Sequence, residues 1–170
     1  MEYFLELSSS GLVRGSIYAL IALGYTMVYG IIQLINFAHG EIYMIGAFVA
    51  LIVSGVLTIY GFSGVSILIL AALIAAIYAA AYGYTLEKIA YRPLRNAPRL
   101  SPLISAIGMS LFLQNYVLLA QTPDFLPFPA LIPDFDFMEP IAHIMGSPEL
   151  VILVTSAVSM VALTVLIKYT

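Results

Sequence analysis

The chain has 170 residues, of which 62% are hydrophobic and only 9% are charged. Soluble domains carry about 25% charged residues, because a charged surface keeps them in water, so a soluble fold is excluded. High hydrophobicity with a net charge of only -3 also excludes a disordered chain. With six Lys and Arg in all, the chain lacks the basic surface that nucleic-acid binding needs. The composition therefore predicts a protein whose solvent is membrane lipid.

Long uncharged runs predict the membrane spans. Asp, Glu, Lys and Arg are absent from residues 15–40, 42–86, 100–123 and 150–167. A helix of about 20 apolar residues crosses a bilayer, so the second run is long enough for two spans joined by a turn at 61–64. Backbone groups in lipid must bond within their own segment, which requires helices. The sequence predicts an all-α, polytopic integral membrane helix bundle with about five transmembrane helices, at 13–34, 41–60, 65–86, 101–121 and 149–168.

The charged residues between the spans predict which loops lie on which side. Segment 87–100 is predicted to be a cytoplasmic basic loop, because positively charged loops stay inside. It holds four of the six basic residues, namely Lys88, Arg92, Arg95 and Arg99. Segment 122–148 is rich in Pro and acidic residues and has no Lys or Arg, so it is predicted to be a periplasmic loop. Residues 1–170 are then one transmembrane domain, and counting back places the N-terminus outside, although Arg14 argues against this side.

Small residues recur every four positions in the third predicted span, at Ala71, Ala75, Ala79 and Gly83. Small side chains at this spacing let two helix backbones approach closely in lipid. We therefore expect this stripe to pack against another helix of the same bundle, with a homodimer through the stripe as the alternative.

A polar island interrupts the apolar sequence at 33–41, with Asn36, His39, Gly40 and Glu41 as its chief members. Charged groups inside a bilayer are costly, so they lie at an interface or face a cavity or a partner. Gly40 favours a break in the helix, and Asn36 is expected to cap the next helix with Glu41 in or near its first turn. Two interpretations remain open: a cytoplasmic turn between two spans, or a discontinuous helix that lines a translocation pathway.

A second polar group, Gln114 and Asn115, lies in the fourth predicted span. Amides in membrane helices either bond a neighbouring helix or face a substrate, and the sequence does not separate these roles. The chain has no Cys, no second His spaced for a metal site beside His39 and Glu41, no serine-nucleophile elbow and no Gly-rich phosphate loop with Lys. We therefore predict no catalytic residue, metal or cofactor, and no enzyme activity. Energy for any pumping would come from ions or from a partner.

Several motifs occur in order along the chain, at 24–32, 35–47, 90–95 and 103–116. Together they resemble the permease subunit of high-affinity branched-chain amino acid ABC importers, whose fold family includes urea and short-chain amide permeases. The resemblance implies a multi-pass protein of the bacterial inner membrane. It also implies a second related permease subunit, two cytoplasmic ATP-binding subunits that hydrolyse ATP, and a periplasmic solute-binding protein that delivers the amino acid.

The resemblance also selects six candidate residues for a substrate pathway or gate: Asn36, His39, Gly40, Glu41, Gln114 and Asn115. Permeases of this family continue beyond the point where this chain stops. The expectation is therefore an N-terminal portion that ends before the loop that couples to the ATPase. Three alternative functions stay open. They are a urea or short-chain amide ABC permease, an ion-coupled carrier or channel, and a non-transporting truncated membrane protein.

Overall fold

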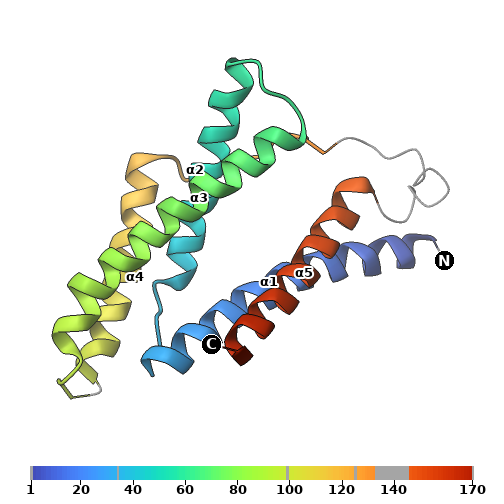
Figure 1. Cartoon of the computed structure of the whole chain (residues 1–170). Coiled ribbons are helices and arrows are strands. Elements are labelled where there is room, and N and C mark those ends of the chain that lie inside the picture. The colour runs from blue at the N-terminus through green and yellow to red at the C-terminus, as the bar shows by residue number, and fades with distance from the viewer. Residues whose placement is uncertain (1, 34, 99, 125, 133–145, 170) are drawn as a thin grey trace. The chain divides into compact units, whose positions relative to one another are not determined.

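A computed structural model describes residues 2–33, 35–98, 100–124, 126–132 and 146–169. Regular secondary structure in these ranges is entirely helical (Figure 1). The long helices, in chain order, are α1 (Glu2–Ile32), α2 (His39–Ile59), α3 (Val65–Leu86), α4 (Leu100–Ala120) and α5 (Ser147–Tyr169). All five are long and apolar enough to cross a membrane, which confirms the predicted all-α class and the number of spans.

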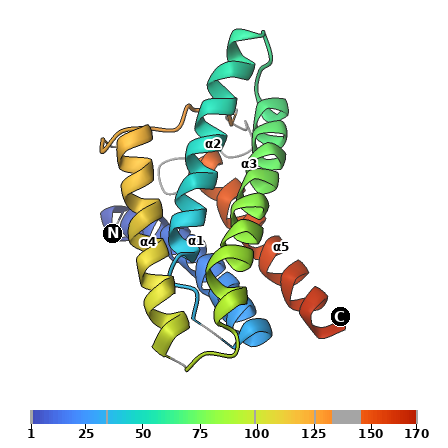
Figure 2. The same cartoon turned by 90° about the vertical axis from the view of Figure 1, so that its left-hand side faces the viewer.

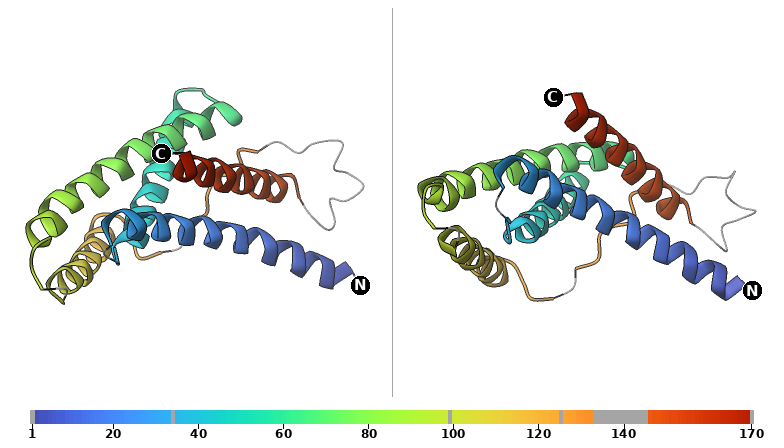
Figure 3. Two further views of the ribbon diagram at one scale, coloured as in Figure 1. Left: turned by 60° about the horizontal axis from the view of Figure 1, so that its bottom comes forward. Right: turned by 90° about the horizontal axis from the view of Figure 1, so that it is seen from below.

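The helix α3 does not stop at its last α-helical residue. It continues as a π-helix, η1 (Glu87–Tyr91), and a 3-10 helix, η2 (Arg92–Leu94). Figure 3 shows the chain turning there, at one end of the helices, before it returns as α4. More than half of the predicted basic loop 87–100 is therefore helical, and Arg99 lies outside the described residues.

The chain divides into two compact units, residues 1–30 with 132–170, and residues 31–131. In the second unit α2 contacts both α3 and α4, and Figure 2 shows α2 between the other two helices. The turn between α2 and α3 lies where the sequence predicts it. Gly61 (φ 83°) and Gly64 (φ 59°) adopt left-handed conformations there, which glycine reaches without a steric penalty.

The small residues of α3 lie against α2. Ala71 and Ala75 are buried, and a Cβ added at Gly46 of α2 would lie 3.8 Å from the Cβ of Ala79. A Cβ added at Gly83 would lie 4.0 Å from the Cδ1 of Ile42. The structure thus places this side of α3 in a close helix–helix contact within the unit.

The first unit holds nearly all of α1 together with α5. Glu149 lies in the first turn of α5, and its Oε2 accepts a hydrogen bond from the backbone N–H of Gly146 at 3.1 Å. This is one half of a capping box, because the side chain satisfies a backbone donor just before the helix. The Oγ of Ser9 in α1 donates to the same carboxylate oxygen at 3.5 Å, which links the two helices of this unit.

The prediction for the first span was wrong at its start, because α1 begins at Glu2 rather than at residue 13. A search for runs without charged residues finds only the part of a helix that can lie in lipid. Where a helix extends beyond the hydrocarbon layer, it accommodates a charged residue such as Glu6 at little cost. In the predicted loop 122–148, residues 122–124 and 126–132 lack regular structure, and 125 and 133–145 lie outside the described residues.

Most side chains of the spans are not covered by the chain itself. Only 6% to 17% of the residues in each span are buried. Large apolar side chains on the outer faces include Leu73, Ile77 and Leu119. An apolar exterior of this extent is stable against lipid or against further helices, and not in water.

Two loops at opposite ends of the antiparallel pair α2 and α3 allow a test of membrane sidedness. A cysteine at Asn96, in the turn after η2, is expected to resist an impermeant thiol reagent in intact cells, because the adjoining basic residues predict that this turn lies in the cytoplasm. A cysteine at Ser63, in the turn between α2 and α3, is the matched control and should label from outside. The native chain has no Cys to interfere. Labelling at 96 but not at 63 would reverse the predicted orientation.

Candidate functional site

The polar island forms a break in the helical path between α1 and α2. Gln33 has a φ of 56°, which is unusual for a residue other than glycine and ends the helical course of α1. The backbone O of Asn36 accepts from the N–H of His39 at 3.1 Å, and its Oδ1 accepts from the N–H of Ala38 at 3.0 Å. These bonds form a compact turn of the kind that asparagine favours, because its side chain can bond the backbone two residues on.

Two details of the prediction for this region were wrong. Ala38, and not Asn36, occupies the position that caps α2, because Asn36 uses its side chain to stabilise the turn before the helix. The break lies before Gly40 rather than at it, since Gly40 is already in the first turn of α2. Nothing lies within 4 Å of a Cβ added at Gly40, so no close contact requires glycine there.

A tyrosine from the far end of α3 reaches this turn. The hydroxyl of Tyr91 donates a hydrogen bond to the Oδ1 of Asn36 at 2.7 Å. Tyr91 is the last residue of η1, and only 5% of it is exposed. The sequence reasoning did not select Tyr91, although it lies in the motif 90–95 that carries part of the family resemblance.

Glu41 lies in the first turn of α2, as the sequence predicts, and is half-buried. Its Oε1 accepts a hydrogen bond from the Oγ of Ser110 in α4 at 3.0 Å. The N-terminus of a helix favours a negative charge, because the backbone dipoles point their positive ends there. His39, the first residue of α2, is also half-buried beside the turn.

Two serines of α4, Ser105 and Ser110, differ from other hydroxyls in this unit. Ser54, Thr58 and Thr85 donate to carbonyl oxygens of their own helices, which satisfies them in lipid. Ser105 instead donates to the backbone O of Ala90 in η1 at 3.2 Å, and Ser110 reaches Glu41. These two hydroxyls therefore connect α4 to the ends of α3 and α2 at the break.

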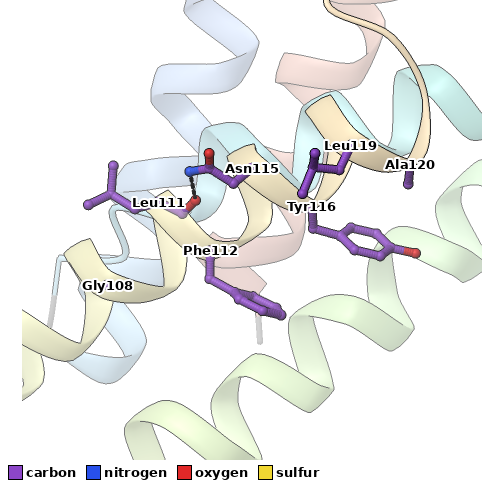
Figure 4. A pocket seen from close by; sticks show the side chains of 7 residues that line it. All are labelled: Gly108, Leu111, Phe112, Asn115, Tyr116, Leu119 and Ala120. Carbon is purple, nitrogen blue, oxygen red and sulfur yellow. Dashed lines mark hydrogen bonds between the residues drawn. The ribbon is translucent and has the colours of Figure 1, made fainter.

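Gln114 and Asn115 are adjacent in sequence but lie in different surroundings. The Nδ2 of Asn115 donates to the backbone O of Leu111 in its own helix at 2.7 Å (Figure 4). Asn115 lines an open hollow on α4 of about 690 Å³, among apolar side chains such as Phe112 and Leu119. Gln114 lines a separate groove.

The groove beside Gln114 has a volume of about 500 Å³ and is bounded by α2, α4 and residues 122–124, 126 and 128. Its walls are largely apolar and include Met44, Phe48 and Leu118. Gln114 and Asp124 add polar groups, and the Oδ2 of Asp124 accepts from the Oγ1 of Thr122 at 3.0 Å. An apolar pocket with a few polar groups is the usual form of a small-molecule site. Here an aliphatic group could pack on the apolar walls while the carboxylate of Asp124 attracts a cation.

Five apolar helices and the polar break before α2 define a multi-pass membrane protein. The family model described as "Branched-chain amino acid transport system / permease component" matches residues 7–170. The chain belongs to this family of membrane permease components, which confirms the resemblance found in the sequence.

Individual relatives agree with the family. The chain is 45% identical over 171 residues to the "High-affinity branched-chain amino acid transport system permease protein LivH" of Escherichia coli (strain K12), and LivH of Salmonella typhimurium gives the same identity. It is 47% identical over 170 residues to the corresponding protein BraD of Pseudomonas aeruginosa. Each alignment covers 98% of this chain but only 55% to 56% of the relative, so the chain spans little more than half of their length. No solved structure matches the chain.

Proposed function

We propose that the chain is part of the membrane-spanning permease subunit of an ATP-driven importer for leucine, isoleucine and valine in the bacterial inner membrane. The observation that carries the proposal is the similarity over 98% of the chain to permeases named for branched-chain amino acid transport. The proposed partners are a second related permease, two cytoplasmic ATP-binding subunits and a periplasmic solute-binding protein. ATP hydrolysis belongs to the ATP-binding subunits, so the permease itself is not an enzyme.

The groove supports this substrate class by its chemistry. A branched aliphatic side chain would pack on Met44, Phe48 and Leu118, because burial of apolar area stabilises the complex. The carboxylate of Asp124 would attract the ammonium group of the amino acid, and the amide of Gln114 would donate to its carboxylate. Asn36, His39, Gly40 and Glu41 would form a gate at the break before α2. Urea and short-chain amides remain the alternative substrates, because they could use Gln114 without the apolar walls.

Uptake of labelled leucine tests the proposal in cells from which the complete gene is deleted and then restored. We expect uptake to depend on the gene, to fall with excess unlabelled isoleucine or valine, and to be unaffected by excess urea. Competition by urea would favour the amide permeases. Uptake that does not change on deletion would contradict the proposed function.

A further inference from the structure

We propose that Tyr91 is a positioning residue of the gate: with Asn36 it forms a clasp that holds the break before α2 closed. The clasp is the hydrogen bond from the Tyr91 hydroxyl to the Asn36 Oδ1 at 2.7 Å. Its role in transport rests on the proposed function, but its effect on the break can be measured without transport.

One oxygen atom of Asn36 accepts two hydrogen bonds at the break. The Oδ1 of Asn36 accepts both from the Tyr91 hydroxyl and from the N–H of Ala38, which caps α2. Ala38 is fully buried, and Tyr91 is nearly so. Hydrogen bonds screened from water are stronger than exposed ones, so the tyrosine fixes the acceptor that in turn fixes the start of α2.

Tyr91 is the last residue of the π-helix η1. Short π-helical turns are uncommon and occur frequently at functional sites. In η1 the backbone O of Ala90 accepts from the Oγ of Ser105 in α4. Ser110, further along α4, donates to Glu41 in the first turn of α2. The clasp and the bonds made by Ser105 and Ser110 therefore join the ends of α2, η1 and α4 at the break.

The contact between Tyr91 and Asn36 differs in kind from the packing of α2 on α3. The packing of α2 on α3 is close and apolar at Gly46 and Gly83, whereas the hydrogen bond from the Tyr91 hydroxyl to Asn36 is a polar contact between η1 and the turn before α2. One hydrogen bond shifts an equilibrium by about 2- to 10-fold. A contact of that strength can open and re-form while the helices stay packed, which suits a gate.

The test measures access to Ala38 in the full-length permease, purified and held in lipid nanodiscs. A cysteine at Ala38 is buried while the break is closed and should react slowly with a small maleimide. We expect Tyr91→Phe to speed this reaction about 3- to 10-fold, because only the hydroxyl is lost. Tyr84→Phe is the matched control, since Tyr84 lies on the same helix but is 65% exposed, and it should not change the rate.

Further variants keep the test decisive if Tyr91→Phe is poorly folded. Asn36→Ala should speed the reaction at least as much as Tyr91→Phe, because it also removes the bond from the N–H of Ala38, and the double variant should react no faster than Asn36→Ala alone. Asn36→Asp keeps an oxygen that can accept from Tyr91 and should keep the reaction slow. A cysteine at Ile35, which is 46% exposed, should react at one rate in every background and reports reagent access.

An unchanged rate at Ala38 in folded Tyr91→Phe and Asn36→Ala would overturn the clasp. An equal increase with Tyr84→Phe would also overturn it. If the rate rises as expected but the wild-type protein supports no leucine uptake, the clasp stands and the proposed function fails. If the reaction at Ala38 speeds up as expected and the wild-type protein takes up leucine, Tyr91→Phe should change the maximal rate of uptake more than the concentration for half-maximal uptake.

Discussion

Replacing Glu41 by glutamine is expected to lower leucine uptake about tenfold or more in cells that produce the full-length permease. Glutamine has the same size and keeps an oxygen that can accept from Ser110, so the helix contact persists. The negative charge at the N-terminus of α2 is lost. Hydrogen bonds to charged groups contribute about 1.5–3 kcal/mol, and each 1.36 kcal/mol is a factor of ten in rate. Uptake of labelled leucine, divided by the amount of permease in the membrane, measures the effect.

The control for this experiment is Glu87→Gln. Glu87 pairs with Arg95 at 3.6 Å on the surface of the turn, where an ion pair contributes little, so uptake should stay normal. Normal uptake by Glu41→Gln at normal abundance would exclude Glu41 from the transport pathway. The carboxylate would then serve only to hold Ser110 and the start of α2.

Replacing Ala71 by leucine is expected to destabilise the folded permease by about 1–3 kcal/mol, because the larger side chain has no space between α3 and α2. Ala71 is 1% exposed, and the neighbouring small-residue positions of α3 lie in contact distance of α2. Unfolding of the purified full-length protein in mixed micelles by increasing SDS measures the change.

The neighbouring Ala72 provides the matched variant. Ala72 follows Ala71 in the same helix but is exposed, so Ala72→Leu makes the same chemical change toward lipid. We expect an effect within about 0.5 kcal/mol there. Equal destabilisation by the two substitutions would show that α3 does not pack on α2 through this side.

The helices were predictable because the hydrocarbon layer imposes a simple rule on composition. Four of the five predicted spans agree with α2 to α5 to within a few residues. The turn at Gly61 and Gly64 was predictable from residue type, because both positions need a left-handed backbone. The start of α1 was not predictable, because a search for uncharged runs finds only the part of a helix that lies in lipid.

The candidate site was predictable only in part. The polar residues at 33–41 stand out against their apolar neighbours, and Glu41 lies in the first turn of α2 as expected. The partner of Asn36 did not stand out, because Tyr91 lies 55 residues away and a tyrosine near a basic loop is ordinary at a membrane interface. Which residues meet across a bundle depends on the rotation of each helix, and that rotation here includes a π-helical turn that no local pattern marks.

The length of α3 with its extension has a consequence for the lipid around it. Its 22 α-helical residues span about 33 Å at 1.5 Å each, close to the thickness of the hydrocarbon layer. The π-helical turn and Tyr91 come after that length, so the clasp would lie near the headgroups of a bilayer whose hydrocarbon layer α3 just spans. A thicker bilayer would cover the Tyr91–Asn36 bond with acyl chains, and a thinner one would leave it to water. Hydrophobic mismatch would thereby bias the break before α2, with the membrane itself as the effector.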